Sequence, residues 1–327
     1  MTVPVFFSID TEEDLWDSYR QTDNPVENVA CLPTLQRLCD RYGAIPTYLV
    51  NYPVASCATS IATVSTLLGQ GRCEIGMHCH SWNTPPFAAE QLEANCSMLS
   101  NLPQSLVFDK LSHLHDTIVR SFGVTPISFR AGRAGFNSSV ALALRNLGYR
   151  VDSSVVPFFD LSQYEGPNFE NAPNVPYRFK PDCTLESHPE GELLEVQQTI
   201  GFLQQNFIGC SSTRKRIAQS FLGRLKLIGV FEVLKVLNLR KLAPEETSLK
   251  DMIALADKCL GEGYPALHMV LHSSTLLPGL NPFAPTKERV EEILSRIEGF
   301  LRFCSLKGFR FYGLSAALNP QILTAIS

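Results

Sequence analysis

The sequence lacks long apolar runs, paired cysteines and an N-terminal basic segment. No stretch approaches 18 consecutive apolar residues, so no membrane-spanning helix is predicted. The N-terminus has no basic residue before its first apolar run and meets carboxylates by residue 10, which argues against a signal peptide. The ten cysteines include no CxxC pair, in a chain of 327 residues that can fold without disulfides. We therefore expect a cytoplasmic protein with reduced thiols.

Several enzyme motifs and an excess of positive charge are also absent. There is no GxSxG, GxxxxGK(S/T), GxGxxG or HExxH motif, which disfavours hydrolases with a serine elbow, nucleotide kinases and nicotinamide enzymes. The chain has 28 basic and 32 acidic residues, a formal net charge of −4. Such a chain lacks the broad positive field that general nucleic-acid binding needs, so no nucleic-acid partner is expected.

Short apolar or β-branched runs alternate with amphipathic segments of helix length, a pattern typical of parallel strands joined by crossover helices. The pattern predicts an α/β fold, a closed or nearly closed barrel that forms one domain over residues 1–327. The expected strands are 3–9, 44–50, 73–77, 127–131, 150–153, 193–197, 267–271 and 309–313. The expected helices are 27–41, 60–68, 90–99, 104–121, 138–147, 249–260 and 286–304.

The composition of residues 157–250 predicts that they form an insertion over one face of the barrel. Its first part, 157–189, is rich in Pro, Asn, Asp and aromatic residues and predicts a long ordered loop. Residues 213–242 then carry eight basic residues and one acid, with apolar residues between the cations. Helices in 214–241 could lie on an anionic membrane near a lipid-linked sugar, or could pack on the barrel with an exposed basic face, which we favour.

Acidic and histidine residues gather where predicted strands end. Asp10 and Glu12 follow the first strand, and alternate residues of an extended chain point the same way, so both share a face. The four acids of residues 10–14 repel one another unless a cation or an arginine compensates them; a solvated loop is the alternative. His78 and His80 follow the third strand with the same spacing, which suits two nitrogen ligands for Zn²⁺ or another transition metal.

Three further strand ends carry candidate polar residues. Arg130 could hold a carboxylate ionised through a two-pronged hydrogen bond, or form an ordinary surface ion pair. Asp152 is a candidate neighbour of the site or a turn cap. His272 is a candidate proton donor near neutral pH, whereas His268, deeper in the same strand, is expected to be structural.

The order of these clusters, an acidic stretch, EIG-x-H, FR-x-G, Y-x-x-D-S-S and LH over residues 6–279, resembles the polysaccharide deacetylase family, also called carbohydrate esterase family 4. The resemblance implies a distorted (β/α) barrel with about seven strands, a divalent metal, and removal of N- or O-acetyl groups from sugars. It also implies that Asp10 is the catalytic base, that Arg130 orients it, and that His272 is the acid.

The same resemblance implies that Glu12, His78 and His80 bind the metal, Zn²⁺ first and Co, Ni or Mn as alternatives. In the family the second metal histidine lies four residues after the first, where this chain has Trp82. This departure keeps open a catalytically weakened barrel that binds a glycan or a glycan-assembly partner. A hydrolase of another non-peptide C–N amide bond is a lesser alternative. The residues expected to contact the acetylated saccharide are Trp82, Asn83, Arg133 and Asp152.

Overall fold

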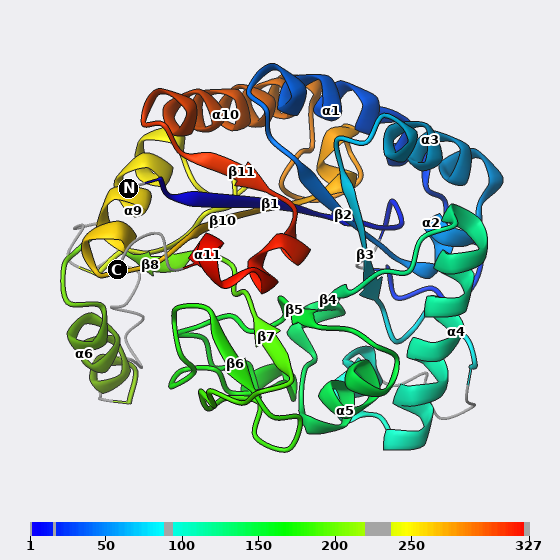
Figure 1. Cartoon of the computed structure of the whole chain (residues 1–327), viewed down its shortest axis with the longest axis horizontal. Helices are drawn as coiled ribbons and strands as arrows, with labels where there is room; N and C mark the ends of the chain where they lie inside the picture. Colours follow the sequence, from blue (N-terminus) through cyan, green and yellow to red (C-terminus); the bar gives the residue numbers. More distant parts are fainter. Residues whose placement is uncertain (1, 16–17, 88–93, 220–236, 324–327) are drawn as a thin grey trace.

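A curved, mostly parallel sheet forms the centre of the molecule, and helices line its outer side (Figure 1). The computed structural model describes residues 2–15, 18–87, 94–219 and 237–323. In these ranges nine strands form the sheet in the order β10-β1-β2-β3-β4-β5-β7-β6, with β11 beside the start of β1. They are β1 Pro4–Thr11, β2 Pro46–Val50, β3 Glu74–Cys79, β4 Ser128–Ala131, β5 Val151–Asp152, β6 Tyr177–Phe179, β7 Leu193–Glu195, β10 Leu267–His272 and β11 Arg310–Tyr312.

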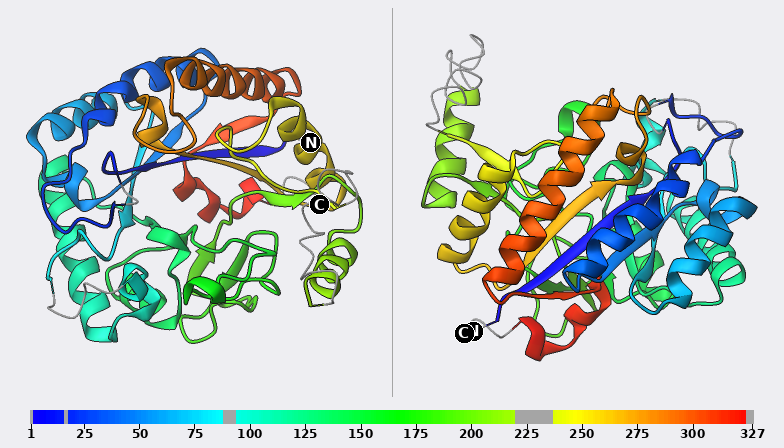
Figure 2. Two further views of the ribbon diagram at one scale, coloured as in Figure 1. Left: turned by 180° about the vertical axis from the view of Figure 1, so that it is seen from behind. Right: turned by 90° about the horizontal axis from the view of Figure 1, so that it is seen from above.

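Most of the helices pack along the outside of this sheet, whereas α11 (Pro320–Leu323) lies on its inner side, where Ile322 and Leu323 pack against an interior apolar cluster (Figure 1). Figure 2 shows α10 running beside the strands and α6 standing at one edge, next to the short strand β8 (Ile200–Phe202). Local signals set several ends: the Thr286 side chain accepts a hydrogen bond from Arg289 N at the start of α10, and α4 ends at Gly123, whose φ is 68°. The helices are α1 Leu32–Arg41, α2 Tyr52–Ser56, α3 Ala58–Gly69, α4 Gln104–Phe122, α5 Ser138–Asn146, α6 Phe207–Gln219, α9 Leu249–Gly261, α10 Lys287–Leu306 and α11 Pro320–Leu323.

The predicted α/β barrel is confirmed as a curled half-barrel rather than a closed ring. Among the described residues, β6 and β10 at the two ends of the sheet share no ladder. A separate antiparallel pair, β8 (Ile200–Phe202) and β9 (Leu239–Lys241), lies beside the end strand β10. The backbone of Thr199 donates to His268 O at 3.0 Å, and Val270 N donates to Leu242 O at 3.1 Å, so this pair is tied to β10.

All eight predicted strands are present, as β1–β5, β7, β10 and β11. The expected helix at 90–99 lies partly outside the described residues, and its described part forms the 3-10 turns Ala94–Ser97 and Leu99–Asn101. The predicted loop 157–189 contains β6, a strand that the Pro-rich composition concealed. Of the basic segment 214–241, for which packing on the barrel was favoured over membrane contact, residues 220–236 lie outside the described part of the chain. None of the described helices has the length and apolar character that crossing a bilayer requires.

Strand β1 shows how the sequence builds the barrel interior. Val5, Phe7 and Ile9 belong to the large apolar cluster between the sheet and the helices. Phe6 points to the opposite side of the sheet, where it belongs to a smaller interior cluster that also contains Leu314. Because side chains alternate along a strand, the residues that follow Phe6 on the inner face are Ser8, Asp10 and Glu12. The inner face of β1 is therefore apolar near its start, at Phe6, and carries carboxylates at its carboxyl end, at Asp10 and Glu12.

Candidate active site

Four parallel strands bring residues from their carboxyl ends to the same edge of the sheet. Asp10, the penultimate residue of β1, lies directly opposite His272 of β10, and His78 of β3 lies opposite Arg130 of β4. These four residues and Glu12 line one cavity of about 290 Å³. The carboxyl ends of parallel strands are the usual position of active sites in α/β barrels. The groups that sequence reasoning placed together, although they span more than 260 positions, thus meet in one place.

The two histidines and Glu12 form a compact buried cluster. His78 Nε2 and His80 Nε2 are 2.9 Å apart, and Glu12 Oε2 lies 3.5 Å from the first and 3.3 Å from the second. Ligands held tetrahedrally by Zn²⁺ at about 2.0–2.2 Å stand roughly 3.4 Å apart. The three side chains are at most 3 % exposed. Their spacing and burial fit a divalent metal.

Hydrogen bonds at the far side of each ring direct both imidazoles toward the cluster. His78 Nδ1 lies 2.9 Å from the carbonyl oxygen of Arg130, and a carbonyl only accepts, so this nitrogen carries the proton. His80 Nδ1 lies 2.9 Å from Glu13 Oε1 and donates to that carboxylate. With both rings neutral, the two Nε2 lone pairs face each other, an arrangement that a cation bound between them stabilises. Glu12 Oε1 is buried and has no hydrogen-bond partner among the described residues, which also favours a bound cation at this cluster.

Glu13 is the supporting residue that sequence reasoning missed. Its carboxylate accepts hydrogen bonds from His80 Nδ1, from Trp82 Nε1 at 3.1 Å and from Asn51 Nδ2. The Trp82 ring also stacks on the His80 ring, with centroids 4.1 Å apart. Trp82, which occupies the position of the family's second histidine, therefore helps to hold the His80 ring in place. His80 then provides the second histidine of the cluster. Carboxylates in this role fix the tautomer and orientation of metal-binding histidines.

Gly132 leaves the space that the His80 ring occupies. A Cβ atom built at this residue would lie 2.4 Å from His80 Cδ2 and 2.9 Å from Cys79 O. We expect Gly132→Ala to displace the His80 ring and to weaken Zn²⁺ binding roughly 10–100-fold, the range seen when outer support of a metal ligand is lost. Titration of Zn²⁺ against a competing chelator measures this. The control is Gly261→Ala, where an added Cβ meets no atom within 4 Å; equal affinity in both variants would contradict the role of Gly132.

Arg130 binds the carboxylate of Asp10 from inside the barrel. Its Nη1 donates to Asp10 Oδ1 at 2.6 Å, and its Nη2 donates to the hydroxyls of Ser8 and Ser153. Although burial alone raises the pKa of Asp10, the Arg130 guanidinium, with His78 and His272 nearby, holds that pKa well below its usual range. Asp10 is consequently ionised and fixed in orientation throughout the physiological pH range.

His268 lies beneath this pair and completes its support. Because the Ser8 hydroxyl accepts from Arg130, it donates its own proton to His268 Nε2, 2.8 Å away. His268 Nδ1 in turn lies 3.2 Å from the carbonyl oxygen of Val196. Burial, followed by the Arg130 charge, lowers the pKa of His268 to about 3, so the ring is neutral. This agrees with the expected structural role of His268.

His272 faces Asp10 across the cavity and is held by Glu245. Its Nε2 lies 4.0 Å from Asp10 Oδ2, and its Nδ1 lies 2.5 Å from Glu245 Oε1. Burial alone lowers the pKa of His272, but Glu245 and the other nearby carboxylates raise it to about 10. Glu245 also accepts from Thr275 Oγ1 at 2.7 Å. The protonated ring therefore directs its Nε2–H toward Asp10 at the cavity. Glu245 follows β9 in a loop, and no motif in the sequence pointed to it.

Of the four residues predicted to contact the substrate, two line the cavity and two lie elsewhere. Trp82 and Arg133 line the cavity. Asn83 instead lines a separate hollow beside Tyr52, because the chain turns after His80. Asp152 is fully buried, and its carboxylate binds Ser154. Neither Asn83 nor Asp152 therefore lines the cavity in this structure, and Asp152 bonds the turn at Ser154, the alternative role expected for it.

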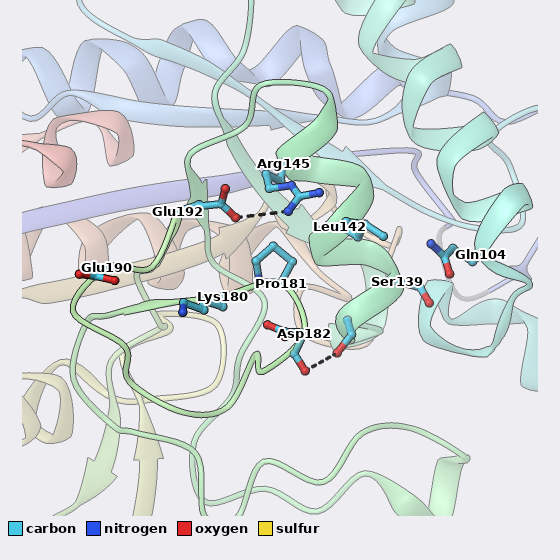
Figure 3. Close-up of a pocket in the computed structure, with 10 residues that line it drawn as sticks. Gln104, Ser139, Leu142, Arg145, Lys180, Pro181, Asp182, Glu190 and Glu192 are labelled. Atoms are coloured by element: carbon cyan, nitrogen blue, oxygen red, sulfur yellow. Dashed lines mark hydrogen bonds and ion pairs between the residues drawn. The ribbon is translucent and has the colours of Figure 1, made fainter.

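A larger hollow of about 600 Å³ lies on the outer side of α5 (Figure 3). It is lined by side chains of both charges, and Arg145 Nη1 lies 3.4 Å from Glu192 Oε2 across it. Both members of this ion pair are at least 40 % exposed, so the pair contributes little to stability. The hollow contains none of the residues that the sequence predicts for chemistry, and it provides control positions for the active-site variants.

Comparison with known proteins identifies the fold. No family model and no curated protein sequence matches the chain. A structure from Mycobacterium smegmatis that bears the name polysaccharide deacetylase aligns over 99% of this chain and 90% of its own, with TM-score 0.54 and 15% identity. A glycoside hydrolase/deacetylase structure from Parabacteroides distasonis aligns over 97% and 70%, with TM-score 0.60 and 10% identity. A 4-alpha-glucanotransferase from Thermococcus litoralis aligns over 97% and 40%, with TM-score 0.53 and 11% identity.

These structures share the curved α/β barrel and act, by their names, in carbohydrate chemistry. At 10–15% identity, the similarity establishes the fold. The chain has the fold of the polysaccharide deacetylases, and the fold resemblance predicted from the motif order is confirmed.

Proposed function

We propose that this protein is a metal-dependent hydrolase that removes acetyl groups from an acetylated saccharide. The observation that carries the proposal is the meeting of an ionised carboxylate, a protonated imidazole and a buried Glu-His-His cluster in one cavity. Each element has a separate task in acyl transfer to water, and the fold is one found in deacetylases.

The metal cluster supplies the electrophilic part of the chemistry. Glu12, His78 and His80 would hold the ion, with Zn²⁺ the first choice for a set of two nitrogens and one carboxylate oxygen. A bound divalent ion lowers the pKa of water toward about 7 and polarises a carbonyl group.

Asp10 and His272 divide the proton transfers. Asp10, kept anionic by Arg130, accepts a proton from water as that water attacks the acetyl carbonyl. His272 donates its Nε2 proton to the sugar nitrogen or oxygen as the bond to the acetyl carbon breaks. Each positioned proton transfer typically contributes about 10²–10⁴ in rate. The products are acetate and the free amine or hydroxyl of the sugar.

The apolar lining of the cavity suits a sugar ring. Phe159, Leu161 and Val156 line it beside the polar groups, and flat apolar faces of sugars pack on such surfaces. A lipid-linked saccharide and a peripheral membrane contact through 214–241 remain proposals of the same kind, and neither is needed for the chemistry.

The test is acetate release by purified protein loaded with Zn²⁺, Co²⁺, Ni²⁺ or Mn²⁺, offered N- and O-acetylated oligosaccharides. We expect metal-loaded protein to release acetate, a chelator to stop the release, and added metal to restore it. His80→Ala should lower both metal content and activity, whereas His188→Ala, in a loop outside the cavity, should change neither. Metal-free protein that binds the oligosaccharides while loaded protein hydrolyses none would favour the glycan-binding alternative. Turnover of other amides alone would favour the third hypothesis.

A further inference from the structure

Four described carboxylates around the cavity each face a basic side chain. Asp10 pairs with Arg130 at 2.6 Å, and Glu245 pairs with His272. Glu13 accepts from His80, as described above. Glu12 faces the two imidazoles of the metal cluster. Among the described residues, these four carboxylates thus have basic partners already, and a further cation that lines the cavity would need another counter-charge.

Arg133 is such a cation. It lines the cavity, and no carboxylate of the described residues lies within ion-pair distance of it. Its guanidinium is positioned by uncharged groups: Nη1 donates to the Ser97 hydroxyl, and Cζ lies 5.3 Å from the centre of the Tyr19 ring. The Tyr19 ring packs edge-on against Trp82, 5.0 Å away. The arginine is thus held at the cavity wall, and none of the carboxylates in the described part of the chain pairs with it.

The backbone at this point is also unusual. Arg133 has φ of 54° and Ala134 has φ of 55°, a left-handed conformation that residues with a Cβ adopt at a free-energy penalty. Such conformations persist where the surrounding structure imposes them, and they concentrate at functional sites. Here the turn after Gly132 directs the Arg133 side chain along the cavity instead of into solvent.

Two other cations flank the same cavity. Lys241, at the end of β9, lines it and forms an ion pair with Glu246 at its outer side. Arg214 of α6 lies with Cζ 6.0 Å from the centre of the Phe159 ring, and Phe159 lines the cavity. Arg214 and Lys241 are the first and last residues of the basic segment 214–241. Apolar walls beneath positive charges strengthen the attraction of an anion.

We infer that the substrate is an acylated sugar that carries a negatively charged group, a carboxylate or a phosphate ester, and that Arg133 binds this group. This rests on the proposed function. A guanidinium offers a planar pair of N–H donors that match either group in a two-pronged geometry. The charged group contacts Arg133 at one wall while the acyl group lies at the metal cluster and Asp10. Arg133 therefore selects the substrate and takes no part in proton transfer.

The test compares matched pairs of acylated sugars that differ only in charge. One pair is N-acetylglucosamine 6-phosphate and N-acetylglucosamine; another is an N-acetylated amino-uronic acid and its neutral sugar. We expect the Zn²⁺-loaded protein to prefer the charged member of at least one pair by about tenfold or more in kcat/KM, the scale of a charge-assisted hydrogen bond. Arg133→Gln should remove the preference, and Arg133→Lys should retain part of it. The control Arg145→Gln, on the outer side of α5, should keep all of it.

A binding measurement separates this assignment from the proposed function. Calorimetric titration of the charged and neutral sugars into metal-free protein excludes direct contact of the anion with the metal. We expect the charged sugar to bind more tightly, in a manner that depends on Arg133. Equal binding and equal kcat/KM within every pair would overturn the assignment and leave deacetylation intact. Arg133-dependent binding without acetate release from any pair would support the anion site and remove the deacetylase proposal. The two pairs distinguish phosphate from carboxylate.

Discussion

Asp10→Asn is expected to lower kcat/KM for acetate release by about 10²–10⁴-fold, the usual contribution of a positioned general base. The amide keeps the shape of the side chain but cannot accept the proton from water. Since Asp10 is not one of the three clustered groups proposed to hold the metal, the zinc content of the variant should equal that of the unmodified protein. Acetate release and metal content, measured on the same preparation, together check this prediction.

A second measurement separates loss of chemistry from loss of structure. Arg130 is only 2 % exposed, so the substitution leaves a buried guanidinium without its carboxylate. Removing one partner of a buried ion pair typically destabilises a protein by about 3–5 kcal/mol. Activity must therefore be compared well below the melting temperature of the variant. Asp182→Asn, on the exposed hollow outside α5, is the matched control and should retain full activity. Unchanged turnover in folded Asp10→Asn protein would exclude Asp10 as the base.

Residues in regular strands could be predicted to share the site, because strand periodicity fixes their direction. Asp10 and Glu12, and likewise His78 and His80, are two residues apart at strand ends, and each pair does line the cavity. Asp152 does not line the cavity for the same reason: Val151 faces the interior cluster, so the next side chain in the strand points to the opposite side of the sheet. There it lies beside Glu195, and burial raises the pKa of both carboxyl groups.

The supporting residues could not be predicted, because long-range contacts place them. Glu245 reaches His272 from a loop 27 positions earlier in the chain, and Glu13 reaches His80 across 67 positions. Both are acids among many in the sequence, and no spacing rule joins them to the histidines. Asn83 shows the complementary error: once the chain leaves β3 and turns, the alternation that placed His80 no longer applies.

Glu245→Gln is expected to move the alkaline limit of activity to lower pH. In the unmodified protein the pKa of His272 is raised to about 10, mainly by Glu245, so the acid keeps its proton through the neutral range. An amide provides no negative charge, and the pKa of His272 should fall toward the ordinary value of about 6.5. At pH 9 the variant should then lose about 10²-fold in kcat/KM, in keeping with loss of a general acid, and at pH 6 much less. Profiles from pH 5 to 10 measure this, with Glu192→Gln as the control.

The same pair makes stability depend on pH in a defined direction. His272 binds its proton more tightly in the folded protein than in the unfolded chain. Its contribution is therefore complete below about pH 6.5 and is lost as the pH rises through about 10. The pKa of Glu245 is lowered by His272, although burial alone raises it, so its contribution is present above the ordinary carboxyl pKa of 4.5 and is lost at lower pH. Urea unfolding should show Glu245→Gln most destabilised near pH 5–6.5, with a deficit that shrinks toward pH 10. A deficit that is constant over this range would show that Glu245 and His272 do not form an ion pair in the folded protein, and the shift in the activity profile would then need another cause.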